Sequence, residues 1–66
     1  MHRIWFNPQT HPELLADGTE YFVRVIGNSY YPVLAIWQSS FNSFRWGTGT
    51  QRFNTWEIYQ ASEKNF

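Results

Sequence analysis

The chain has 66 residues, no cysteine, and five basic residues against five acidic ones. A chain of this length forms one domain, here residues 1–66, and without cysteine it has neither disulfides nor thiolate metal ligands. The balanced charge disfavours a generic polyanion binder, which needs a surplus of lysine and arginine. Aromatic residues make up 21% of the chain, and we expect them to supply most of the core packing.

Apolar runs are short throughout the sequence. Near the N-terminus only Ile4-Trp5-Phe6 is apolar, which is too little for a secretory signal, and no run approaches the roughly 20 residues that cross a bilayer. We therefore expect a soluble, intracellular protein. Because Asn7-Pro8 ends the apolar run, we interpret it as a short strand or an anchor laid against the sheet.

One helical turn is predicted before the first long strand. Residues 10–16 place Thr10 as an N-cap, Glu13 three residues later in a capping-box arrangement, and a proline near the start. Asp17-Gly18 is a strong turn signal. It predicts that the first long strand begins at about Thr19.

The strongest structural signal is residues 20–37, where two runs rich in β-branched and aromatic residues flank Gly27-Asn28-Ser29. These three residues readily form a tight turn, so the segment predicts a β-hairpin. Alternation along a strand then assigns the faces. One face of the hairpin carries Tyr21, Val23 and Val25 from its first strand, and Val33, Ala35 and Trp37 from its second.

Further strands are expected after the hairpin. Residues 38–40 turn the chain into a strand at 41–46, and a glycine-rich turn at 47–50 leads to a last strand at 51–59, with Trp56 and Ile58 on one side. Residues 61–66 are predicted to form a frayed tail. The expected fold is mainly β: a small antiparallel meander of about four to five strands, forming a curled sheet or a partly open barrel, with at most one helical turn near the N-terminus.

Four segments carry a family resemblance through their order and spacing: Asp17-Gly18-Thr19, the extended run 21–25, Ala35-Ile36-Trp37, and the closing Trp56-Glu57-Ile58-Tyr59. Together they resemble a small domain of unknown function that is widespread in bacteriophage and prophage genomes. The resemblance implies a phage accessory protein acting in a bacterial cell. Proteins of that kind often bind and block a host factor, and anti-CRISPR proteins, which inhibit a host defence system, are among them.

The sequence offers no metal-binding or nucleophile motif. We interpret His2 and His11 as surface imidazoles, because without cysteine a metal site would need several converging carboxylates. Ser39-Ser40 lacks the setting of a nucleophilic serine. The loop Gly47-Thr48-Gly49-Thr50 lacks the lysine and the following helix of a phosphate-binding loop, so a turn between strands is the better interpretation.

The acidic residues have structural explanations that compete with catalysis. Asp17 belongs to a turn, Glu13 to a helix cap, Glu57 to the outward side of a strand and Glu63 to the tail. A pair of catalytic carboxylates would need to face each other across a cleft. We therefore expect no enzymatic activity, no cofactor and no bound metal.

Aromatic residues interleaved with arginine are the feature that suggests a function. A small sheet cannot hide 14 rings, namely four Trp, four Tyr and six Phe, so some should stay exposed, Tyr59 among the candidates, and mark a binding surface. We assign structural roles to Val23, Val25, Trp37, Phe44, Trp46 and Trp56. The candidate binding surface consists of Tyr30, Tyr31, Phe41, Arg45, Arg52 and Phe53.

Three partners are compatible with such a surface. Tyr, Trp and Arg dominate protein-protein hot spots, and the neutral net charge favours a host protein or protein complex as the partner. The same residue types would also suit a single-stranded nucleic acid, whose bases stack on exposed rings beside cations. A third alternative is a homo-oligomer formed through an unpaired strand edge.

Overall fold

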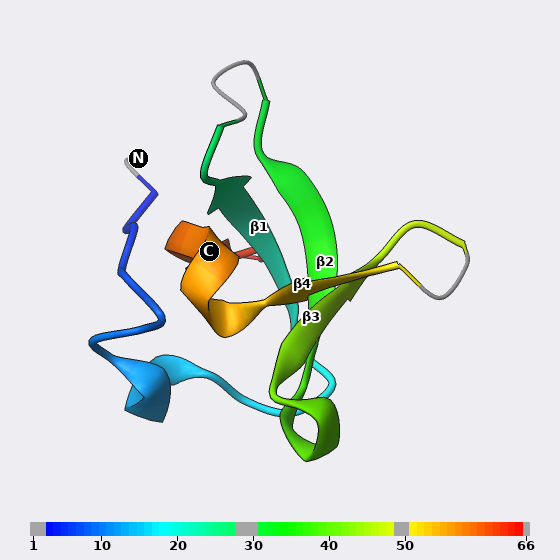
Figure 1. Cartoon of the computed structure of the whole chain (residues 1–66). Helices are drawn as coiled ribbons and strands as arrows, with labels where there is room; N and C mark the ends of the chain where they lie inside the picture. Colours follow the sequence, from blue (N-terminus) through cyan, green and yellow to red (C-terminus); the bar gives the residue numbers. More distant parts are fainter. Residues whose placement is uncertain (1–2, 28–30, 49–50, 66) are drawn as a thin grey trace.

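The structure, a computed structural model, describes residues 3–27, 31–48 and 51–65. This part of the chain contains five strands, β1 (Glu20–Val25), β2 (Val33–Gln38), β3 (Ser43–Trp46), β4 (Arg52–Asn54) and β5 (Ile58–Glu63) (Figure 1). It also contains three single turns of 3-10 helix, η1 (Pro12–Leu14), η2 (Ser39–Phe41) and η3 (Thr55–Glu57). The strands form one antiparallel sheet in the order β4-β3-β2-β1-β5, which confirms the predicted mainly β class.

The predicted hairpin is formed by β1 and β2. Tyr21 lies opposite Ala35 and Val23 opposite Val33, so these four residues share one face of the sheet, as predicted. Gly27 has φ +88 at the end of the first strand, a conformation that side-chain-bearing residues rarely adopt. The other two predicted turn residues, Asn28 and Ser29, lie outside the described residues.

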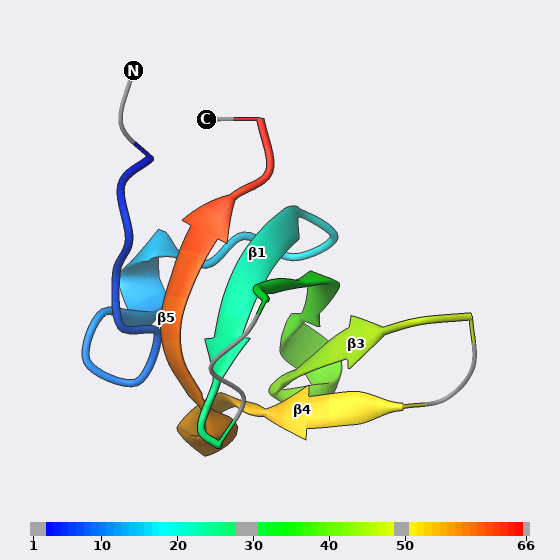
Figure 2. The same cartoon turned by 90° about the horizontal axis from the view of Figure 1, so that it is seen from above.

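The chain runs as a meander from β1 to β4, and β5 then returns to pair with β1. β4 and β5 are therefore the two edges of the sheet. Figure 2 shows β1 and β5 side by side and, across the molecule, β3 beside β4. The sheet is thus curled and remains open between its two edge strands. This is the curled sheet that was one of the two predicted forms.

The prediction of a single last strand at 51–59 is wrong. η3 interrupts it, because the Glu57 carboxylate accepts the N–H of Asn54 at 2.7 Å and holds one helical turn there. This also corrects the role expected for Glu57, which is a cap and not a strand-face residue. The interruption turns Trp56 outward, and its side chain is 65% exposed, so its predicted place in the core is wrong as well.

The prediction of a frayed tail is wrong for residues 61–63, since β5 continues to Glu63 and these residues pair with β1. Ala61 and Ser62 are fully buried, although they give no apolar periodicity in the sequence. On the other side of β5, the N–H and carbonyl of Phe6 exchange hydrogen bonds of 2.9 and 2.7 Å with Ala61, so the predicted N-terminal anchor is confirmed.

The predicted helical turn exists but starts later and lacks the predicted cap. η1 covers three residues, and His11 stands at its N-cap without a side-chain hydrogen bond. The N–H groups of Thr10 and His11 both donate to the Asn7 carbonyl, at 3.2 and 2.9 Å. In this earlier turn the N–H and hydroxyl of Thr10 both donate to the Asn7 carbonyl. In the predicted capping box the Thr10 N–H would instead have donated to Glu13.

The predicted turn before the first long strand is confirmed. Gly18 has φ +78 and donates its N–H to the Trp37 carbonyl at 2.9 Å, and Trp37 donates in return to Thr19 at 3.1 Å. Asp17 accepts hydrogen bonds from the N–H and hydroxyl of Ser39, at 2.9 and 3.1 Å. The turn therefore fixes the start of β1 against the end of β2.

The core lies on the inner face of the curled sheet and is largely aromatic. Tyr21 and Phe44 meet edge to face at its centre, with ring centroids 6.1 Å apart. The Tyr21 hydroxyl accepts the Ala16 N–H at 2.8 Å and donates to the Leu14 carbonyl at 3.2 Å, so this buried polar group is satisfied. The fully enclosed core residues are Tyr21, Val23, Ala35, Trp37, Phe44, Ile58 and Ala61, with Val25 and Trp46 packed against them.

The helical turns of the described chain are short. None of its helices has the length and apolar character of a membrane span.

Candidate functional site: the arginine face

The outer face of the sheet, opposite the core, carries arginine on several strands. Because Tyr21 and Val23 point into the core, Phe22 and Arg24 of β1 point outward. The register places Ile36 of β2, Arg45 of β3 and Arg52 of β4 in one row across the same face. We call this surface the arginine face; it consists of Arg3, Trp5, Phe22, Arg24, Leu34, Ile36, Phe41, Arg45 and Arg52.

Three of the four arginines of the chain lie over aromatic rings on this face. The Arg24 guanidinium carbon is 4.0 Å from the Trp5 ring centroid and that of Arg52 is 4.3 Å from Phe41. Arg3 lies over Phe22 at 4.8 Å. These are cation-π distances, and each contact is worth about 0.5–1 kcal/mol at an exposed site. The rings therefore hold the arginines in place while both remain at the surface.

The hydrogen bonds of these arginines go to neutral groups. Arg24 donates to the Gln60 side-chain oxygen at 2.7 Å, and Arg52 donates through Nε to the Gln38 side-chain oxygen at 3.1 Å. Arg3 donates to the backbone carbonyl of Glu63. A glutamine amide or a backbone carbonyl orients a guanidinium without neutralising its charge.

Carboxylates near this face are engaged elsewhere. Among the residues that the structure describes, the ion pair within 4 Å is that of Lys64 with Glu20, at 3.5 Å. Asp17 is bound by Ser39 and Glu57 by the backbone of Asn54. The four arginines of the chain thus share one face of the sheet, and Glu20, which the register places on the same face, is paired with Lys64.

The structure brings together half of the six predicted binding residues. Phe41, Arg45 and Arg52 lie on the arginine face, on η2 and on two adjacent strands. Phe53 is half-buried on the inner face, where its ring stacks on Trp46 with centroids 5.1 Å apart and planes 5° apart. Its assignment to the binding surface is wrong, because a residue next to Arg52 in a strand must point the other way.

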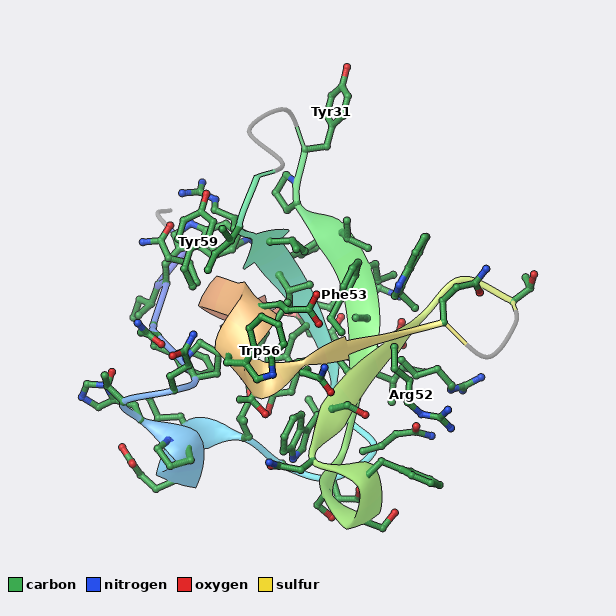
Figure 3. All side chains as sticks on the ribbon, viewed as in Figure 1. Tyr31, Arg52, Phe53, Trp56 and Tyr59 are labelled. Carbon is green, nitrogen blue, oxygen red and sulfur yellow. The ribbon has the colours of Figure 1, made fainter. Side chains whose placement is uncertain are left out.

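The two tyrosines of the predicted surface do not join these residues. Tyr31 is 78% exposed, but it stands just before β2, at the far end of the molecule from Arg52 (Figure 3). Tyr30 lies outside the described residues. Tyr31, Phe41 and Tyr59 are exposed, as predicted. The prediction that Tyr31 belongs to the same contiguous patch as Arg52 is wrong.

The residues missed from the predicted surface lie together at the β1 end of the arginine face. Arg3 and Trp5 join it because Phe6 bridges to β5, a long-range contact that no local pattern reveals. Phe22 and Arg24 did give a signal. They alternate with the apolar residues of β1, and a strand face that mixes an aromatic ring with an arginine is typical of a partly covered outer surface.

A shallow groove of about 470 Å³ adjoins Phe41 at the edge of the arginine face. It is bordered by the exposed Trp56 (Figure 3) and holds amide and hydroxyl groups of Gln9, Asn42, Asn54 and Thr55. None of the groove-lining residues is acidic, basic or a histidine. Within the described ranges, no three of histidine, cysteine, aspartate and glutamate come close enough to hold a metal ion.

Together, the fold and this surface define a small antiparallel β module with one arginine-bearing face. Comparison with protein-family models, with curated proteins and with solved structures gave no match.

Proposed function

We propose that this protein is a non-enzymatic binding module and that its arginine face contacts an acidic surface of a protein partner. The observation that carries the proposal is the way Arg24 and Arg52 are held, each by one glutamine amide and one aromatic ring. Such neutral partners fix the position of a guanidinium and leave its charge for another molecule. Arginine and aromatic residues are also the types that dominate protein-protein hot spots.

The phage resemblance supports a setting for this binding. The segments Asp17-Gly18-Thr19 and Ala35-Ile36-Trp37 resemble a phage and prophage domain, and phage accessory proteins often act by blocking a host protein. We therefore propose a host protein or complex in the bacterial cytoplasm as the partner. Inhibition of a defence system such as CRISPR is one form that this would take.

Single-stranded nucleic acid is a second candidate, favoured by the gathering of positive charge on one face. The rings of that face argue for protein instead. Trp5, Phe22 and Phe41 each have one side covered by a guanidinium within 4.0–4.8 Å of the centroid. A base that stacks on such a ring would have to displace the arginine from that side.

A homo-oligomer through a free strand edge remains the third proposal and has the weakest support. β4 is an edge of the sheet, but it has only three residues and one of them is Arg52. Short, charged edge strands discourage pairing with a second copy. A single monomer mass in light scattering over a dilution series would remove this candidate.

Capture from a bacterial lysate, with and without nuclease treatment, tests the main proposal. The baits are the wild-type protein, the double variant Arg45→Gln/Arg52→Gln, and Lys64→Gln as a control for lost charge. We expect the wild type and the lysine variant to retain the same protein, identified by mass spectrometry, and the double variant to lose it. Capture that persists in the double variant would place the contact on another surface. Capture that disappears on nuclease treatment would favour nucleic acid.

A further inference from the structure

Arg45 and Arg52 face each other directly across two antiparallel strands of the arginine face. Like charges in this position destabilise a sheet, so such a pair is normally relieved by a nearby carboxylate. Glu20 is the acidic residue of the same cross-strand row, but Ile36 separates it from Arg45. Its carboxylate lies 3.5 Å from Lys64 instead.

The surroundings of the two arginines restrict their movement and leave their charge in place. Arg52 is fixed by the Phe41 ring and by the Gln38 side-chain oxygen. Arg45 is half-buried, and its Nε is enclosed by protein without a hydrogen-bond partner. Among the residues that the structure describes, the terminal nitrogens of neither guanidinium donate a hydrogen bond to the protein.

We propose that Arg45 and Arg52 together bind a phosphate monoester carried by a protein partner, that is, a phosphorylated side chain. This inference rests on the proposed function and specifies which chemical group the arginine face recognises. The two guanidinium groups present two positive charges, and their terminal nitrogens offer planar pairs of N–H donors. A phosphate monoester has about −1.5 to −2 charges at pH 7 and three acceptor oxygens, and therefore complements both groups at once.

Other anions complement the pair less well. A single carboxylate carries one charge and two oxygens, so it neutralises one arginine and leaves the repulsion with the other. A phosphodiester of a nucleic acid also carries a single charge per phosphate. The difference between one and two negative charges on the ligand is what the test measures.

The experiment uses isotope-labelled full-length protein and follows the Nε–Hε signals of its four arginines during titration. The probes are N-acetyl-phosphoserine amide, N-acetyl-glutamate amide and a short single-stranded oligonucleotide of thymidines. With phosphoserine amide we expect saturating shifts of the Arg45 and Arg52 signals. With glutamate amide the affinity should be about tenfold weaker, because it has one charge fewer. Arg24 lies on β1, and β2 separates that strand from the pair on β3 and β4, so Arg24 is the internal control and should shift least.

Two variants with the same change in charge complete the test. Arg52→Gln should weaken phosphoserine amide binding about tenfold, because one of two charge-assisted partners is lost, and Lys64→Gln should leave it unchanged. Arg52 is exposed, so its variant should keep a dispersed spectrum. The inference is overturned by equal affinity for the glutamate probe, by preferential binding of the oligonucleotide, by equal shifts of all four arginines, or by no shift at all.

The outcomes separate this inference from the proposed function. If the protein does not bind phosphoserine amide but partner capture still depends on Arg45 and Arg52, the phosphate site is removed and the protein-binding module stays. Specific phosphoserine amide binding without any captured partner would keep the phosphate site and remove the proposed protein contact.

Discussion

The guanidinium groups of Arg24 and Arg52 are oriented by neutral partners, so both keep their positive charge at the surface. A salt bridge at the same place would neutralise the charge and offer up to about 1 kcal/mol of stability. The Gln60 and Gln38 amides orient the groups without doing so. At the scale of single residues, these contacts therefore orient the arginine side chains and add little to the stability of the fold.

Truncation of a half-buried aromatic side chain and of an exposed one should change the free energy of unfolding by different amounts. Phe53→Ala should lower the free energy of unfolding by roughly 2 kcal/mol, less than the 3–5 kcal/mol of a fully buried Phe, because its half-buried ring stacks on Trp46. Tyr31→Ala should change it by less than about 0.5 kcal/mol, since the side chain is 78% exposed. Urea unfolding followed by tryptophan fluorescence measures both. Equal effects would contradict the difference in burial between the two rings.

At the scale of elements, β5 is the strand on which the closure of the fold depends. It pairs with β1 on one side, and on the other Phe6 exchanges two backbone hydrogen bonds with Ala61. Its small buried residues let the N-terminal segment approach closely. A strand with a weak sequence signal thus connects the first and last parts of the chain.

Deletion of residues 61–66 is expected to abolish cooperative unfolding, because it removes half of β5 and exposes the edge of β1. Circular dichroism during heating would show a broad, low-amplitude change in place of a sigmoidal transition. Lys64→Ala serves as the control. Its exposed ion pair with Glu20 should cost less than about 1 kcal/mol. A sharp transition in the truncated protein would mean that β5 ends in a dispensable tail after all.

At the scale of the whole molecule, neutrality hides an uneven distribution of charge. Five basic and five acidic residues balance, yet the four arginines share the outer face, while Asp17, Glu20 and Glu57 are each paired with another group of the chain. Local potential, and not net charge, governs the approach of an anionic partner.

This asymmetry predicts different behaviour of two variants that have the same net charge. Arg52→Gln should elute from a cation-exchange column at pH 7 at clearly lower salt than Lys64→Gln, because Arg52 belongs to a cluster of unpaired cations and Lys64 is paired with Glu20. Identical elution of the two variants would show that the arginine face has no distinct potential.

The sequence by itself determined the class of the fold, the β1–β2 hairpin, the turn at Asp17-Gly18-Thr19 and most of the core. These features follow from alternation and turn chemistry, which act between residues close together in the chain. It also identified Phe41, Arg45 and Arg52 as surface residues of interest.

Only the tertiary structure decided which residues meet. The return of β5 to β1 and the placement of Arg24 over Trp5 join positions far apart in the sequence. Local patterns do not encode such contacts, because they depend on how the whole sheet folds. The outward turn of Trp56 is different, since the capping box between Asn54 and Glu57 sets it locally and is a signal that the expectation of one continuous strand overlooked. The arginine face combines the N-terminal segment with strands that follow much later in the chain.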